Sequence, residues 1–221
     1  DRDAAPDTGR AQLLAPLQHP EQASGGTLIE AKPADQFRKH GLGAGGLQWQ
    51  GDGLGLEEIA ELYGGSTPLR DKPRFWGGDI YWVTPTDLPM PDEGISVVSK
   101  TKDRITQAGL DNSSATVVPK GTVLFSSRAT IGKVAVADMP LTTNQGFANF
   151  VPHSEVTSRF LAYALWFHRE DIARLSGSTT FKEVSRSTLR KYHLPVPPLA
   201  EQERIVKLLD EADELRKLRA Q

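Results

Sequence analysis

Two short segments combine cations, hydroxyl groups and glycines in a way that suits contact with nucleic acid. In GGSTPLRDKPRFW, Ser66 and Thr67 can donate hydrogen bonds to phosphate. Arg70 and Lys72 can neutralise phosphate charge, and Arg74 carries the planar fork that matches the acceptor edge of guanine. The segment therefore contains the residue types that nucleic-acid recognition uses.

A second segment, SSRATIGK, lies between two strand-like runs and contains the same mixture. Its candidate contact residues are Ser126, Ser127, Arg128, Thr130 and Lys133. Loops held by a rigid scaffold often carry binding residues, so this turn is a second candidate for nucleic-acid contact. Solvated turns have a similar composition, and composition alone leaves both interpretations open.

Motifs of the common enzyme classes are absent from the sequence. It contains no G-x-x-x-x-G-K-[ST] phosphate loop, no G-x-G-x-x-G fingerprint, no H-E-x-x-H pair and no G-x-S-x-G elbow. The histidines lack ligand spacing and are interpreted as structural or surface residues: His19, His40, His153, His168 and His193. The sequence therefore predicts a binding protein, with no catalytic residue, no metal ligand and no cofactor.

One segment keeps an enzymatic alternative open. In LIEAK, Glu30 and Lys32 have the spacing of the second half of a PD…(D/E)xK nuclease motif, and Pro6 and Asp7 lie upstream. Such nucleases need carboxylates that converge on a divalent metal and a lysine near the attacking water. Short patterns arise by chance, and little chain precedes this one to form a supporting sheet, so a DNA nuclease is an alternative and not the leading hypothesis.

Composition and charge restrict the class of protein. The chain has 221 residues, 38% of them hydrophobic, a formal net charge of −2 and no cysteine, which suits one domain with appendages and excludes disulfides. No apolar run reaches the length of a membrane span, so we expect a cytoplasmic protein without a membrane partner. Because residue 1 is aspartate, we interpret the chain as a processed product or a piece of a longer protein. The near-neutral charge confines nucleic-acid contact to local clusters of cations.

Hydrophobic patterning predicts the elements that position these residues. Residues 1–52 contain few aliphatic clusters and are interpreted as a flexible or extraneous lead-in. The body that follows has a short turn or helix in LGLEEIAELYGG, strands in DIYWV, TVLFS, KVAVA and FANFV, and helical spacing in RFLAYALWFHREDIARL. Turn residues between TVLFS and KVAVA predict a hairpin. The fold class is therefore α+β with a predominantly β body.

The C-terminal part, residues 199–221, has the pattern of a coiled-coil helix. Three prolines in LPVPPLAEQERIV stiffen its approach, and Pro198 suits a first helical turn because it has no N–H to lose. Apolar residues then follow at the spacing of a seam: Ile205, Leu208, Ala212 and Leu215, with Leu209 and Leu218 alongside. An isolated helix of this length is marginal in water, so the seam predicts a partner helix.

Five blocks together resemble a known family. GGSTP, FWGGDIYWVTPTDL, GTVLFSSRATIGKVAV, TNQGFANFVP and LSGSTTFKEVSRSTLRKYHLPVPPLAEQERIV occur in this order. The series is similar to a target recognition domain of the DNA specificity subunit of Type I restriction-modification systems, over about residues 54–221. The resemblance implies an α+β, β-rich target recognition domain over residues 53–198 and a C-terminal dimerisation or spacer helix, interpreted as truncated, over residues 199–221.

The resemblance also implies a function and partners. The domain is expected to bind double-stranded DNA sequence-specifically and to supply target specificity to adenine-N6 methyltransferase and restriction subunits. Those subunits would carry out methylation and cleavage. Further residues in the matching blocks join the candidate DNA contacts: Thr84, Asn144, Gln145, Ser178, Thr179 and Lys182.

The chain departs from the family in one respect. A full specificity subunit carries two recognition domains and two such helices, whereas this chain carries one of each. We therefore expect a homodimer in which a second copy supplies the antiparallel partner helix. A coiled-coil protein adaptor without DNA binding is the other alternative, and in that case the cationic segments are ordinary solvated turns.

Overall fold

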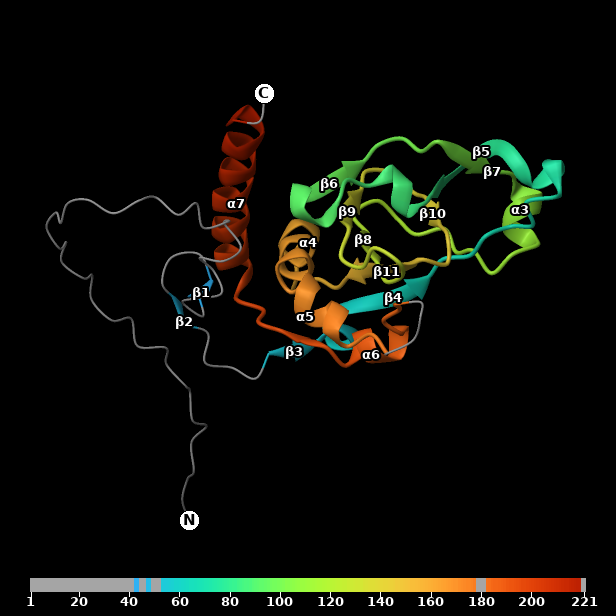
Figure 1. The fold of residues 1–221 in the computed structure, drawn as a ribbon. Coiled ribbons are helices and arrows are strands. Elements are labelled where there is room, and N and C mark those ends of the chain that lie inside the picture. Colours follow the sequence, from blue (N-terminus) through green and yellow to red (C-terminus); the bar gives the residue numbers. More distant parts are fainter. Residues whose placement is uncertain (1–41, 44–46, 49–52, 178–181, 220–221) are drawn as a thin grey trace, which may run out of the picture.

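The computed structural model describes residues 42–43, 47–48, 53–177 and 182–219. A five-stranded sheet with the strand order β4-β11-β8-β9-β6 forms its centre (Figure 1). The strands are β4 (Ala60–Gly64), β6 (Ile95–Val98), β8 (Val123–Ser126), β9 (Val134–Ala137) and β11 (Phe147–Pro152). Neighbouring strands are antiparallel except β6 and β9, which run parallel, so the sheet is mixed.

The central strands are buried on both faces. Along β8, Val123 and Phe125 belong to one hydrophobic cluster and Leu124 to another, because successive side chains of a strand point to opposite faces. Val134 and Ala135 of β9 divide in the same way. Burial on both faces explains why these runs are almost wholly apolar. The predicted hairpin is confirmed as the antiparallel pair β8 and β9.

Helices cover one face of this sheet. They are α2 (Leu56–Ile59), α4 (Ser158–Phe167), α5 (Arg169–Arg174), α6 (Arg186–Arg190) and α7 (Leu199–Arg219). Helix α4 packs against β8 and β9, and its Leu161 and Leu165 are fully buried. The hydroxyl of Thr157 caps α4 by accepting a hydrogen bond of 3.3 Å from the N–H of Phe160. The helical spacing of RFLAYALWFHREDIARL therefore marks a buried face, with His168 separating α4 from α5.

A three-stranded sheet with the order β10-β5-β7 builds a second lobe. It consists of β5 (Trp76–Val83), β7 (Asp103–Ile105) and β10 (Thr142–Thr143), accompanied by the 3-10 helix η1 (Pro73–Phe75) and by α3 (Gln107–Asp111). Val83 and Leu141 pack with Leu124 and Phe147 of the central sheet. Hydrophobic contact with the sheet face opposite α4 thus sets the position of this lobe.

The remaining elements are short. Strand β3 (Leu54–Gly55) pairs with β12 (His193–Leu194), and β1 (Leu42–Gly43) pairs with β2 (Leu47–Gln48). Two 3-10 helices, η2 (Pro85–Asp87) and η3 (Pro91–Glu93), lie between β5 and β6.

Helix α7 is fastened to the body by a buried glutamine. Gln202 is fully buried, and its Oε1 accepts a hydrogen bond of 2.9 Å from the N–H of Thr157. Its Nε2 donates to the carbonyl groups of Glu155 and Pro197 over 2.8 and 2.9 Å. Because every polar atom of this side chain has a partner, these hydrogen bonds offset the cost of removing it from water. Gln202 therefore fixes the angle at which α7 leaves the body.

The predicted coiled-coil seam divides into two parts. Ile205 is buried in the core of the body, and Leu209 packs partly against that core. Leu208, Leu215 and Leu218 are 43%, 59% and 66% exposed, and Ala212 is also exposed. The expectation that all these residues share one intermolecular seam is corrected, because the chain's own α4 covers the side of α7 that carries Ile205.

The helix predicted in LGLEEIAELYGG is half right. It forms α2 but ends at Ile59, and residues 60–64 form the edge strand β4. Glu61 pairs there with Val151 of β11. Long-range pairing with β11 overrides the local helical pattern, since strand formation depends on neighbours more than on propensity.

Candidate nucleic-acid interface

The loop from Ser66 to Phe75 connects β4 to β5 and is fastened by two tryptophan side chains. Nε1 of Trp82 donates to the carbonyl of Ser66 over 2.9 Å, and Nε1 of Trp76 donates to the carbonyl of Leu69 over 3.1 Å. The two indole rings meet edge to face, with 5.0 Å between their centroids and 85° between their planes. The loop therefore has a defined course, although much of its surface is exposed.

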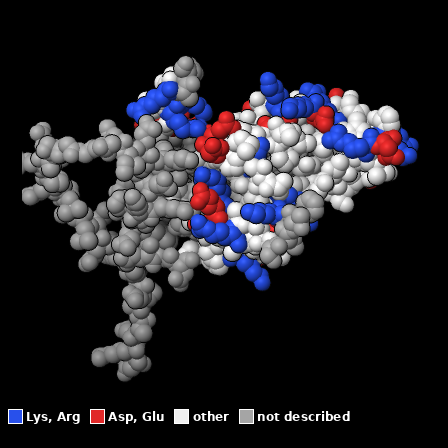
Figure 2. All heavy atoms as spheres, in the orientation of Figure 1, with Lys and Arg blue, Asp and Glu red and all other residues white. Residues whose placement is uncertain are grey.

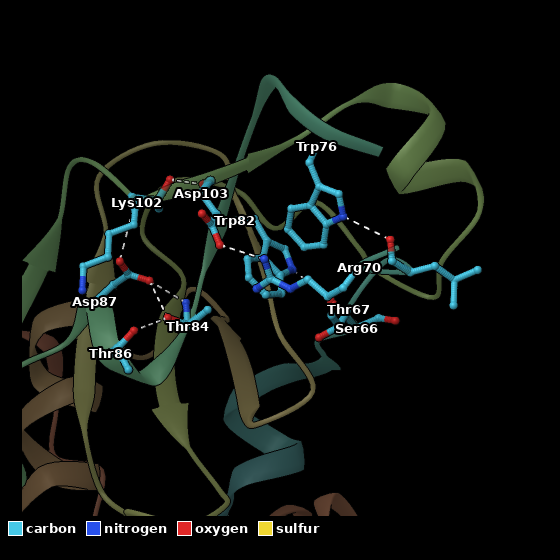
Figure 3. Close-up of polar contacts among 12 residues, drawn as sticks. Ser66, Thr67, Arg70, Trp76, Trp82, Thr84, Thr86, Asp87, Lys102 and Asp103 are labelled. Atoms are coloured by element: carbon cyan, nitrogen blue, oxygen red, sulfur yellow. Dashed lines mark hydrogen bonds and ion pairs between the residues drawn. The ribbon is translucent and has the colours of Figure 1, made fainter. Parts of the chain in front are cut away.

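Arg70 lies in the corner between these indole rings (Figure 3). Its Cζ is 4.0 Å from the ring centroid of Trp76 and 4.7 Å from that of Trp82, where cation–π attraction operates. Nη1 donates to Oδ2 of Asp103 on β7 over 3.1 Å. The side chain is nevertheless 56% exposed. Its neighbours thus fix the guanidinium while part of it stays accessible to solvent.

The other predicted residues of this loop have different surroundings. Lys72 and Arg74 are exposed, and Cζ of Arg74 lies 5.1 Å from the ring centroid of Phe75. The Thr67 hydroxyl donates to Oε1 of Gln145. This bond joins the loop to the segment between β10 and β11.

The β8–β9 turn uses two of its predicted contact residues internally. Ser126 is fully buried, and its Oγ donates to the carbonyl of Thr130 over 2.6 Å and accepts from the N–H of Lys133 over 2.8 Å. Ser127 is also buried, and its N–H donates to the carbonyl of Gly146 over 2.8 Å. The prediction that both serines contact DNA is therefore corrected, because they shape the turn from inside the protein. Arg128 is exposed and Thr130 is half-buried.

Lys133 is corrected in the same way, whereas Thr84 stays a predicted contact that also hydrogen-bonds within the protein. Lys133 is 8% exposed, and its Nζ donates to the carbonyls of Pro85 and Leu88 over 2.8 and 3.0 Å. Its charge therefore faces the protein interior and holds η2 against the central sheet. Thr84 is half-buried and caps η2, with its hydroxyl donating to Oδ2 of Asp87 over 2.8 Å.

A polar groove of about 600 Å³ lies between the end of β4, the β8–β9 turn and α6. Arg128, Arg186 and Arg190 line it, together with Gln145 and Glu183, and we call it the arginine groove. Asn144 is half-buried next to it, and its Oδ1 accepts a hydrogen bond of 2.9 Å from the N–H of Gly146. The groove combines guanidinium, amide and hydroxyl groups, which are the donors that phosphate and base edges accept.

Two glycines let side chains lie close to the backbone at one wall of the groove. A Cβ on Gly64 would lie 2.1 Å from Nη1 of Arg186, and a Cβ on Gly65 would lie 1.9 Å from the carbonyl oxygen of Asn144. Any larger residue at either position would displace its neighbour. The GG pair therefore allows Arg186 to lie across the end of β4.

The charge of the groove is unbalanced. Nε of Arg128 pairs with Oε1 of Glu183 over 2.7 Å. Nη2 of Arg190 donates to the carbonyl of Leu62 over 3.3 Å. Within residues 53–177 and 182–219, neither Arg186 nor Arg190 forms an ion pair. The groove therefore carries an excess of positive charge that suits an anion.

Sequence reasoning missed Arg186 and Arg190. The available signal was a pair of cations four residues apart in SRSTLRK, a spacing that places both on one face of a helical turn. Lys182, which was predicted, is exposed beside the groove, and its carbonyl accepts a hydrogen bond from the N–H of Ala129 over 3.2 Å. Ser178 and Thr179 lie outside the described residues, as do Glu30 and Lys32 of the nuclease hypothesis.

Figure 2 shows Lys and Arg, mixed with Asp and Glu, over the lobe that carries β5, β7 and α3, and again at the C-terminal end of α7. On the face drawn in Figure 2, local clusters and not a continuous basic surface thus carry the positive charge. The described ranges contain no group of three or more His, Cys, Asp or Glu side chains that could hold a metal ion. Among the helices that the structure describes, none is long and apolar enough to cross a membrane.

Comparison with known proteins identifies relatives of this chain. Residues 54–221 match the family described as Type I restriction modification DNA specificity domain. The chain is 38% identical over 190 residues to the Type I restriction enzyme MjaIX specificity subunit of Methanocaldococcus jannaschii, an alignment that covers 85% of this chain and 43% of that protein. The chain therefore spans less than half the length of this curated relative.

Solved structures share the fold. The HsdS subunit from Thermoanaerobacter tengcongensis is 23% identical, with a TM-score of 0.54, and the match covers 73% of this chain and 37% of that chain. A structure of a type I R-M system, described in terms of complex assembly and conformational transition, is 24% identical with a TM-score of 0.57 and covers 73% of this chain and 38% of its own. The β-rich body with helices on one face is thus an architecture already seen in such proteins.

Proposed function

The chain belongs to the family of Type I restriction modification DNA specificity domains, and from this membership we propose that it binds double-stranded DNA sequence-specifically. It would supply target specificity to a restriction-modification complex. Adenine-N6 methyltransferase and restriction subunits would then carry out methylation and cleavage, the former after taking the target adenine out of the base stack.

The observation that carries the proposal is the position of the arginine groove next to the tryptophan-fastened loop. Gln145 lines the groove and accepts a hydrogen bond from Thr67 of the loop. The N–H of Ser66 donates to the carbonyl of Thr143 over 2.9 Å, which fixes the same junction. The segments that carry Arg70 and the arginines of the groove are therefore joined at this junction.

The two parts of this surface suit different parts of DNA. Arg186 and Arg190 have uncompensated charge, which favours phosphate, and contacts to phosphate fix the position of a protein on the duplex. Arg70 and Arg128 are each paired with a carboxylate and exposed. Such restrained arginines suit the hydrogen-bonding edges of bases in the major groove.

A selection experiment tests the proposal. The full chain is incubated with a library of random duplexes, bound duplexes are recovered over several rounds, and affinity is compared between the selected site and its scrambled version. We expect enrichment of one sequence and tighter binding to it. Equal binding to selected and scrambled duplexes, or no binding to either, contradicts the proposal.

The alternatives predict other outcomes. A coiled-coil adaptor would bind neither duplex yet would still associate through its helix. A nuclease would cleave duplex DNA in the presence of magnesium, and Glu30→Gln would abolish that cleavage. We expect the chain to leave selected and scrambled duplexes intact with and without magnesium.

We further propose that the outward face of α7 is a contact with a second copy of the chain. Leu208, Ala212 and Leu215 follow one another at the spacing of a coiled-coil stripe and are exposed. An apolar stripe complements itself when two copies are related by a two-fold axis. A two-fold dimer would present two reading surfaces and prefer an inverted repeat with a fixed spacer.

A further inference from the structure

We propose that Arg70 reads a guanine base of the DNA target, an inference that rests on the proposed function. Of the described arginines bordering the candidate interface, it is the one held by two aromatic rings as well as by an ion pair. The consequence is a restrained guanidinium with unused donors.

The ring contacts leave hydrogen-bond donors of the guanidinium unused. Trp76 and Trp82 flank the group, at 4.0 and 4.7 Å from Cζ to the ring centroids. The carboxylate of Asp103 accepts a hydrogen bond from one N–H of Nη1. Arginine has five N–H donors in one plane, and among the described residues no other hydrogen bond from this side chain is found. Two coplanar donors are therefore available at a side chain that is 56% exposed, and a bidentate contact to O6 and N7 of guanine requires two such donors.

The charge of the site favours a base over a phosphate. The carboxylate of Asp103, 3.1 Å from Nη1, offsets the charge of the guanidinium and repels a second anion. A guanine edge is uncharged and accepts hydrogen bonds, so it avoids this repulsion. Arg186 and Arg190, without an ion pair in the described ranges, offer phosphate a better site.

The fastened loop makes this reading contact selective. Indole N–H groups hold the carbonyls of Ser66 and Leu69, both in the part of the loop that precedes Arg70. A side chain already held in its binding geometry loses little conformational entropy on binding. Lys72 lacks the planar fork, and Arg74 is exposed next to a single ring at 5.1 Å. Both are therefore less suited to discriminate between bases.

A purely structural role for Arg70 makes a different prediction. Trp82 is only 1% exposed, and the stem of Arg70 lies beside it, so removing the side chain affects packing as well as hydrogen bonding. Arg70→Met keeps an apolar stem against the indoles and removes every donor. Arg70→Lys keeps the charge and removes the fork. Comparing these variants separates packing, charge and bidentate recognition.

The experiment uses the selected duplex and versions in which each guanine in turn is replaced by 7-deazaguanine, which lacks the N7 acceptor. For the wild-type chain, we expect one replacement to weaken binding by about 5-fold or more. This is the lower end of the range for a bidentate base contact, because 7-deazaguanine lacks one of the two acceptors and keeps O6. In Arg70→Met that replacement should cost nothing further, and Arg70→Lys should not restore discrimination. Arg174→Ala, which removes another exposed arginine paired with a carboxylate, should bind like the wild type.

Other results decide against the inference. If each 7-deazaguanine replacement weakens DNA binding by the wild type and by Arg70→Met to the same extent, Arg70 reads no guanine. If Arg70→Lys binds all duplexes like the wild type, the residue contacts phosphate. If the wild-type chain prefers no sequence at all, the proposed function fails, and the inference fails with it. The selection with the wild-type chain therefore tests sequence-specific DNA binding. The 7-deazaguanine replacements in wild type and Arg70→Met separately test whether Arg70 contacts guanine.

Discussion

The hydroxyl of Tyr163 on α4 donates a hydrogen bond of 2.6 Å to the carboxylate of Asp210 on α7. Nη2 of Arg159, one turn earlier on α4, pairs with the same oxygen. This contact lies beyond Gln202 along α7, and Arg216 continues the attachment by donating to the carbonyl of Glu93. Helix α7 is therefore attached to the body at several points along its length.

Removing the Asp210 carboxylate should loosen this attachment. In Asp210→Ala the partly buried Tyr163 hydroxyl loses its acceptor, and we expect the free energy of unfolding to fall by about 1–3 kcal/mol. Urea denaturation measures the change. Glu211→Ala, at an exposed neighbouring position, is the control and should change stability by less than about 0.5 kcal/mol. Equal effects of the two substitutions would show that the contact does not stabilise the fold.

Stability should also respond to alkaline pH through Tyr163. Burial, followed by the hydrogen bond to Asp210 and the charge of that carboxylate, raises the pKa of Tyr163 above the ordinary value of 10.0. A group whose pKa is raised on folding stabilises the native state fully below its unfolded pKa, and this contribution declines as pH rises towards the folded pKa. The difference in unfolding free energy between wild type and Tyr163→Phe should therefore be constant up to about pH 9 and shrink above pH 10. A difference that stays unchanged at pH 11 contradicts the assignment.

Lys133 should contribute to stability and not to DNA contact. In Lys133→Ala the carbonyls of Pro85 and Leu88 lose their donor, which we expect to cost about 1–3 kcal/mol. Lys120→Ala is the matched control, because that lysine is exposed and, among the described residues, pairs with Asp138 alone, which is also exposed. Thermal denaturation should show a lower midpoint for Lys133→Ala alone. If Lys133→Ala keeps the wild-type midpoint but weakens DNA binding, the sequence interpretation of Lys133 as a DNA contact was right.

The salt dependence of DNA binding should distinguish the arginine groove, which is expected to contact phosphate, from Arg70 and Arg128, which are expected to contact bases. The slope of log K against log[salt] is about −0.9 per phosphate neutralised, so Arg186→Ala with Arg190→Ala should make the slope shallower by about 1 to 2. Binding to selected and scrambled duplexes should weaken alike. Because the net charge of the chain is only −2 and its cations are local, a wild-type slope that demands ten or more phosphate contacts would contradict this account.

The outward leucines of α7 should determine the oligomeric state. Light scattering on the intact chain is expected to show a dimer, and Leu208→Glu with Leu215→Glu should give a monomer that keeps the wild-type circular dichroism spectrum. Its thermal midpoint should be lower, because dimerisation stabilises the folded chain. Val117→Glu, at a loop residue that is 43% exposed, controls for adding a charge at an exposed apolar position. A chain that is monomeric at high concentration, or a double variant that still dimerises, shows that this face is not the interface.

The sequence by itself determined the elements whose burial is strongest. The runs around Val123 and Val134 are apolar because the sheet buries both faces, and turn residues between them specify the hairpin that the structure contains. The spacing of Leu161 and Leu165 marked α4 because one face of that helix is buried. Five ordered blocks also identified the family, since their spacing reflects a whole domain and not one short pattern.

Only the tertiary structure decided which polar residues face solvent and which partner each one has. Ser126 and Arg128 are two residues apart in one turn, yet the first is buried and the second exposed. Arg70 differs from Lys72 in its contacts, because β5 and β7 place Trp82 and Asp103 next to its guanidinium. Periodicity along the chain reports how much a side chain is buried, but it does not say what covers it. Long-range contacts supply that information. Because of them, residues 60–64 form a strand beside β11 and Ile205 packs in the core of the body.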